Sequence, residues 1–372
     1  MHYFEYATKD TTLYEVSSSM NTGLDEILEV RKDMNANGSV IYTTRALIKF
    51  NTDFISDSIS SGLITSSSRT RFYLNLYDAN SEALNVSQTL YGYPISQSWE
   101  QGGGYAQSNP IIEDGASWNY KDNNVSKTAW SNVTSSGGTW YSGSQYEASQ
   151  SFNHEPADLR MDVTDIVWKW HHGTIPNEGF MIKRSGSIGN TDSNAEEGND
   201  THYGNFIFFG RDTNTIYQPK LEVVWDDSTW STGSLSSLTS DNLQDMVLFM
   251  RGLRPEYKEK SKVKFRVTGR ERFPEKSYST SGYSTGYTTV KTLPSGSTFY
   301  EIKDAYTEEV IVPFGSGSIV SCDSTGNYFN FWMNGLQSER FYRINYKIVS
   351  GSGTSDETVE FYDEKHSFKV VR

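Results

Sequence analysis

The stretch RFYLNLYD, residues 71–78, decides the fold class. Its apolar residues Phe72, Leu74 and Leu76 alternate with more polar ones, which is the period of two expected for a strand with one buried face. Further strand-like stretches occur at Ala46–Asn51, Asn205–Phe209, Lys220–Trp225, Lys262–Val267, Thr307–Phe314, Phe341–Val349 and Ser367–Val371. The sequence therefore predicts an all-β protein.

Composition agrees with this prediction. The chain has 372 residues, enough for two domains, and 14% of them are aromatic, which excludes a disordered chain. The single cysteine, Cys322, excludes an intrachain disulfide within this sequence, and we expect it to fill a strand position and not to act as a nucleophile. The sequence has no run of apolar residues long enough to cross a membrane, and its start lacks the basic flank and apolar segment of a signal peptide. We expect synthesis in a host cytoplasm and no membrane insertion.

Charge is distributed unevenly along the chain. Residues 1–227 contain 15 Lys and Arg against 29 Asp and Glu, whereas residues 228–372 contain 18 against 17. The acidic balance argues against nucleic acid or anionic lipid as a main partner. A Ser/Thr-rich stretch over residues 227–244 reads as a linker between the two parts. We therefore predict a β-sandwich over residues 1–226 and a second, immunoglobulin-like β-sandwich over residues 245–372.

One segment of the first domain has helical periodicity. Asp162–Gly173 places apolar residues at i, i+3, i+4 and i+7, with Asp162 as the N-cap and Gly173 as the left-handed end. The stripe consists of Val163, Ile166, Val167 and Trp170. This pattern predicts a single short helix packed on an otherwise β domain.

Several segments, taken in order, resemble a known family. They are Asp10–Val30, Thr43–Asn51, Arg71–Ala79, Tyr93–Gly103, Asp162–Arg184 and Gln218–Trp225. Together they resemble the DNRLRE-type β-sandwich, a carbohydrate-binding-like jelly roll of bacterial surface proteins and polysaccharide-active enzymes. The resemblance spans about residues 8–226 and implies a jelly-roll-like sandwich. We expect the chain to depart from that family in having neither a signal peptide nor a catalytic module.

Unexported chains built of β modules with Ser/Thr/Gly-rich loops are similar to virion proteins of tailed bacteriophages. This similarity implies a non-enzymatic structural component of the neck, tail, baseplate or a fibre, located in the virion and assembled with other virion proteins and copies of itself. No nucleophile, phosphate-binding or metalloprotease motif appears, so we expect neither catalytic residues nor a cofactor.

The alternative function is a polysaccharide-binding module for host-surface recognition. Aromatic side chains in or beside the long loops would stack on sugar rings if they are exposed together. The competing interpretation places the same side chains in a core or an assembly contact. The set is Trp99, Tyr105, Trp118, Trp130, Trp140 and Tyr141.

Two charged segments are further candidates. The loop carrying Asp192, Glu196, Glu197 and Asp200 offers hard oxygen ligands for Ca²⁺, although a solvated acidic loop is the simpler interpretation.

The second segment has cations at successive even positions, among them Lys260, Lys262, Lys264 and Arg266. Such a stripe indicates either a solvated sheet face or edge, or a docking surface for an acidic neighbour such as the acidic domain of another copy.

Overall fold

The computed structural model describes residues 1–34, 41–65, 69–124, 127–131, 137–186, 195–238, 243, 246–272, 290–350 and 357–372. The chain divides into two compact units. We call residues Glu5–Ser61 and Arg71–Glu222 the N-terminal unit, and residues Met1–Phe4, Gly62–Thr70 and Val223–Arg372 the C-terminal unit.

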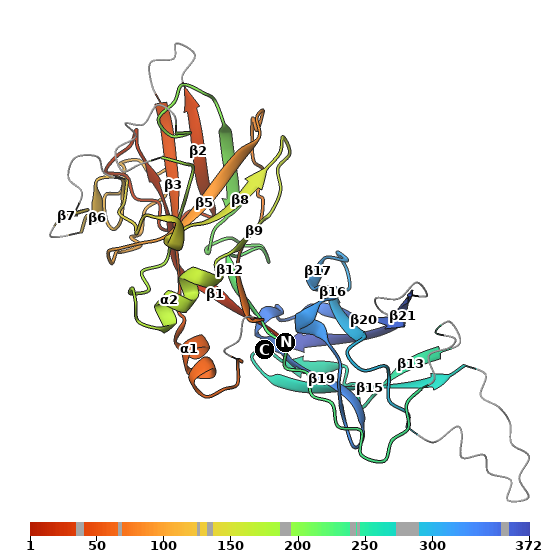
Figure 1. The fold of residues 1–372 in the computed structure, drawn as a ribbon. Coiled ribbons are helices and arrows are strands. Elements are labelled where there is room, and N and C mark those ends of the chain that lie inside the picture. Colours follow the sequence, from red (N-terminus) through yellow and green to blue (C-terminus); the bar gives the residue numbers. More distant parts are fainter. Residues whose placement is uncertain are drawn as a thin grey trace, which may run out of the picture. The chain divides into compact units, whose positions relative to one another are not determined.

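The prediction of an all-β protein is confirmed, because strands dominate the described residues of both units (Figure 1). The first twelve strands are β1 (His2–Tyr14), β2 (Ile27–Met34), β3 (Ile41–Phe50), β4 (Arg71–Leu76), β5 (Gln88–Pro94), β6 (Tyr120–Asp122), β7 (Thr128–Ala129), β8 (Ala148–Phe152), β9 (Leu159–Asp162), β10 (Phe180–Lys183), β11 (Gly204–Phe209) and β12 (Lys220–Val224).

The remaining strands belong to the C-terminal unit. They are β13 (Met246–Arg251), β14 (Glu256–Lys258), β15 (Lys262–Glu271), β16 (Thr298–Asp304), β17 (Val310–Val312), β18 (Ser321–Asp323), β19 (Gly326–Trp332), β20 (Phe341–Ser350) and β21 (Thr358–Val371).

A ten-stranded sheet organises the N-terminal unit, with the order β8-β5-β10-β3-β1-β12-β4-β9 and with β2 and β11 attached through β3. Strand β3 changes partners along its length. Its first residues pair with β2 (Lys32 opposite Thr43), and its later ones pair with β1 and β10. The opening stretch forms β4, where Phe72, Leu74 and Leu76 are completely buried, as their alternation predicts.

The predicted helix is present as α2 (Thr164–His171). Its apolar stripe is buried, and Gly173 adopts a φ of +67° at the C-terminal end. The N-cap residue is Val163 rather than Asp162, but the Asp162 carboxylate still accepts a hydrogen bond from the Thr164 N–H at 3.0 Å.

The prediction of a single helix is wrong, since α1 (Asp53–Ser60) is a second one. It buries Ile55 and Ile59, which are four residues apart and therefore share a face. The serines and aspartates between them favour turns in isolation. Two apolar residues in such a segment were therefore too few to predict a helix from the sequence.

Gly173 provides a direct test of the helix end. An added Cβ there meets no atom within 4 Å, so the cost of Gly173→Ala comes from its left-handed backbone alone. We expect a loss of about 1 kcal/mol in the free energy of unfolding, measured by denaturant titration. Gly315→Ala is the matched control, because Gly315 also has open space but an extended φ of 174°. Equal losses in both variants would contradict this explanation.

Two sheets enclose the core of the C-terminal unit. One has the order β13-β15-β19-β18 and the other β14-β21-β20-β16-β17. Their inner faces meet through aromatic rings: the Tyr300 and Phe329 centroids lie 3.9 Å apart, and those of Phe265 and Phe368 lie 5.4 Å apart.

The boundaries between the units differ from the predicted ones. Residues 227–238, predicted as linker, pair with the C-terminal unit, because Trp230 forms a bridge with Cys322 and Ser237 one with Thr292. Phe4, predicted to lie in the first domain, is buried in the core of the C-terminal unit. A Ser/Thr-rich stretch can donate and accept backbone hydrogen bonds like any other, which composition alone does not show.

Candidate functional site

The predicted cationic stripe lies on β15, in the four-stranded sheet of the C-terminal unit. Lys262 and Lys264 are exposed and Arg266 is half-buried, whereas the alternate residues Phe265 and Val267 are buried in the core. Alternation along a strand puts these cations on the outer face of the sheet.

Lys260 does not belong to this row. It has a φ of +59° and lies before the first residue of β15. The even spacing in the sequence therefore extends beyond the strand, and only Lys262, Lys264 and Arg266 form a row on β15.

Aromatic side chains on the neighbouring strand β19 accompany the cations. In the antiparallel register Lys262 lies opposite Trp332 and Arg266 opposite Tyr328. The Lys264 Nζ lies 3.6 Å from the Tyr328 ring centroid, and the Lys262 Nζ lies 5.3 Å from that of Trp332. These distances are typical of cation–π contacts. Neither aromatic residue was predicted from the sequence, although the period of two in Gly326–Trp332 places Tyr328 and Trp332 on the face opposite the buried Phe329 and Phe331.

Asp323 on β18 neutralises part of the row. Arg266 donates to both of its carboxylate oxygens, at 3.0 and 2.8 Å, and Lys264 approaches to 2.9 Å. The hydrogen bonds from Arg266 hold the pKa of Asp323 well below its usual range. Two cations therefore share one carboxylate, which stays ionised at any ordinary pH.

A further cation joins this face from the other side. Arg251 at the end of β13 lies directly opposite Arg266 in the register of β13 and β15. Directly opposed residues of an antiparallel pair point to the same side, and like charges in this position repel. Arg251 is exposed, and no acidic partner is found for it among the residues that the structure describes.

The aromatic residues predicted for sugar stacking divide into two groups. Four are buried in one core cluster of the N-terminal unit and have no exposed ring face: Trp99, Trp118, Trp130 and Trp140. Stacking on a sugar needs an exposed face, so these four side chains fit the alternative of a core. Tyr105 is 47% exposed and Tyr141 is half-buried, with its centroid 5.5 Å from that of Tyr146.

Within the acidic loop, Glu197 is neither a Ca²⁺ ligand nor a solvated side chain. Its carboxylate is buried and accepts hydrogen bonds from Arg45, with an Nη2 to Oε2 distance of 2.8 Å, while the Lys183 Nζ lies 2.9 Å from Oε2. The rings of Trp118 and Trp140 cover these cations, with centroids 4.7 and 5.1 Å from the Arg45 guanidinium.

This arrangement leaves Glu197 with no free oxygen for a metal ion and no contact with solvent. Glu196 is half-buried and Asp200 is exposed, while Asp192 lies outside the described residues. Over the described ranges, no group of three or more His, Cys, Asp or Glu side chains is arranged to hold a metal ion.

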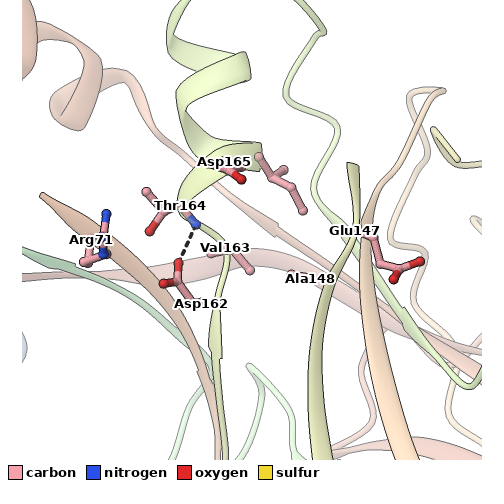
Figure 2. Close-up of a pocket in the computed structure, with 8 residues that line it drawn as sticks. Arg71, Glu147, Ala148, Asp162, Val163, Thr164 and Asp165 are labelled. Atoms are coloured by element: carbon pink, nitrogen blue, oxygen red, sulfur yellow. Dashed lines mark hydrogen bonds between the residues drawn. The ribbon is translucent and has the colours of Figure 1, made fainter. Parts of the chain in front are cut away.

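A polar groove opens beside the start of α2 (Figure 2). It has a volume of about 270 Å³, and its charged lining consists of Arg71, Glu147, Asp162 and Asp165. The Tyr93 hydroxyl orients the Glu147 carboxylate by donating a hydrogen bond at 2.7 Å. Among the described residues, each of these carboxylates accepts at most one hydrogen bond, so oxygens remain to accept hydrogen bonds from a ligand.

No protein-family model matches the sequence, and no curated protein matches it. The resemblance to the DNRLRE-type sandwich therefore stays a prediction. Within the described residues, none of the helices has the length and apolar character needed to span a membrane.

Proposed function

We propose that this chain is a non-enzymatic structural component of a tailed-phage virion, in the neck, tail, baseplate or a fibre. It assembles with other virion proteins and with copies of itself through protein–protein interfaces. In finer terms, the N-terminal unit is a jelly-roll-like sandwich of the DNRLRE type, and the C-terminal unit is an immunoglobulin-like sandwich that docks to the particle.

An exposed apolar patch on the five-stranded sheet is the observation that supports assembly most directly. Phe361 and Val359 on β21 are 62% and 40% exposed. The Phe361 ring centroid lies 5.8 Å from that of Phe314 and 5.9 Å from the Lys347 Nζ. Contiguous apolar surface rimmed by polar groups is typical of protein–protein interaction sites.

Mass spectrometry of purified phage particles tests the proposal. We expect the chain in fixed stoichiometry with known virion proteins. Particles that are complete and infectious without it would overturn the proposal. Phe361→Ser should lower its incorporation severalfold, whereas Val16→Ser, which changes an exposed apolar residue of the N-terminal unit, should not.

The groove beside α2 supports a second candidate function, a polysaccharide-binding module. Carboxylates and an arginine provide acceptors and donors for sugar hydroxyls. Tyr146, which directly precedes Glu147, is half-buried and has the Lys169 Nζ 5.5 Å from its ring centroid. Tyr146 therefore places an aromatic ring next in sequence to a carboxylate of the groove lining, and such a ring offers an apolar face to a sugar.

Titration against host-surface glycans tests this candidate. If the groove binds a glycan, Glu147→Gln should weaken binding at least about tenfold, because Glu147 lines the groove, and Tyr146→Ala tests whether the neighbouring ring contributes. Tyr306→Ala is the control, since Tyr306 is 92% exposed in the C-terminal unit. Binding that is absent, or that is unchanged in both groove variants, rules out this site.

A further inference from the structure

We propose that the outer face of the four-stranded sheet binds the acidic N-terminal unit of a second copy of this chain. The inference rests on the proposed structural function and specifies one of its interfaces. We call this surface the cationic face and define it by Arg251, Lys262, Lys264, Arg266, Tyr328 and Trp332.

The cationic face carries an excess of positive charge that the sheet itself does not balance. The face has four cations, and the Asp323 carboxylate pairs with two of them, Lys264 and Arg266. Arg251 and Arg266 oppose each other across two strands, an arrangement that costs stability when no anion lies between them. An acidic partner placed over the face would remove that cost.

The two units have the charges that such a contact requires. The N-terminal unit contains 14 Lys and Arg against 27 Asp and Glu and therefore carries the entire net charge of −13. The C-terminal unit contains 19 of each and is neutral overall, so the cationic face is a local concentration of charge and not part of a general excess. Each copy of the chain has one acidic N-terminal unit and one cationic face, so the two surfaces are present in equal numbers. This is why we take a second copy as the partner.

The aromatic rings prepare the face for binding. Tyr328 and Trp332 hold the ammonium groups of Lys264 and Lys262 above the sheet, which reduces the side-chain freedom that binding would otherwise remove. Successive cations on β15 are two residues, or roughly 7 Å, apart. Carboxylates on a facing surface can pair with such a row one by one.

The contact joins two different surfaces, so it is heterologous. Repeating it produces a closed ring or an open filament, depending on whether the rotation closes. Because the charges lie at the surface, the contact should weaken strongly as salt rises.

Sedimentation of the full chain with two charge-reversal variants tests the proposal. At about 50 mM salt, wild-type protein should form oligomers that dissociate at about 500 mM. Arg251→Glu and Lys262→Glu should each raise the dissociation constant at least about tenfold. Neither residue has an acidic partner in the described chain, so both variants should fold, which their unfolding transitions will verify. Lys365→Glu makes the same charge change on an exposed residue of β21 and should leave assembly unchanged.

Three outcomes would overturn the inference. They are a wild-type chain that stays monomeric at low salt, oligomers that the two variants do not weaken, and a monomer whose cationic face binds an anionic polysaccharide or single-stranded nucleic acid instead. The particle analysis described above is independent of these results. A chain found in virions that fails this test retains the proposed function and loses only this interface.

Discussion

Replacing Glu197 with glutamine should destabilise the N-terminal unit by about 3–5 kcal/mol, because it leaves two buried cations without a counter-ion. The side chains of Arg45, Lys183 and Glu197 are at most 1% exposed. Burial alone would raise the pKa of Glu197, but Arg45 and Lys183 lower it below its ordinary value. The amide of the variant keeps the shape and loses the charge. Tryptophan fluorescence in a denaturant titration reports the change, since Trp118 and Trp140 adjoin the cations.

Two features distinguish this prediction from a general loss of packing. Burial lowers the pKa of Lys183 to about 8, so this lysine can release its proton on folding, whereas Arg45 cannot. Stability lost in Glu197→Gln should therefore return in part as the pH rises from 7 to 9. Glu100→Gln is the control, because its ion pair with Lys9 lies at the surface. A variant as stable as the wild type would show that the buried ion pairs contribute little.

The pH dependence of stability should change when Asp10 is replaced by asparagine. Asp10 is buried in β1, and burial raises the pKa of its carboxyl to about 7. The folded chain therefore holds this proton between about pH 4 and 7, where the unfolded chain has released it. As the pH rises through that window, the free energy of unfolding of the wild type falls by up to about 1.4 kcal/mol for each pH unit.

Asp10→Asn removes this titration and keeps an acceptor for the Arg211 N–H. We expect the variant to be more stable than the wild type at pH 8, and its advantage to vanish toward pH 4. The difference in the free energy of unfolding between the two proteins, measured at a series of pH values, isolates the contribution of this residue. Asp57→Asn on the exposed side of α1 should keep the wild-type profile. A difference that does not vary with pH would refute the assignment.

Local sequence patterns predicted the strands well and the long-range contacts poorly. The alternation in β4, β15 and β20 depends only on neighbouring residues, so it is visible without a structure. The stripe on β15 was predicted for the same reason. Its aromatic and acidic partners lie on other strands more than 50 residues away, and no local signal links them to it.

The tryptophans show the same limit more sharply. Trp118 and Trp140 lie in segments with few regular elements, where aromatic residues read equally as core or as binding surface. What decides the matter is Arg45, which inserts a guanidinium between them and Glu197. A core of this kind combines indole rings with buried charges, and hydrophobic periodicity does not detect it.

The four residues that open the chain have a consequence for how this protein can be divided. Phe4 is 4% exposed, and an added Cβ at Gly335 would lie 2.2 Å from its ring. A fragment cut at the Ser/Thr-rich stretch would lack this side chain and leave a hole in the second hydrophobic interior. Recombination that exchanges residues 223–372 would therefore have to carry along a matching Met1–Phe4 segment, so these two parts of the sequence should evolve together.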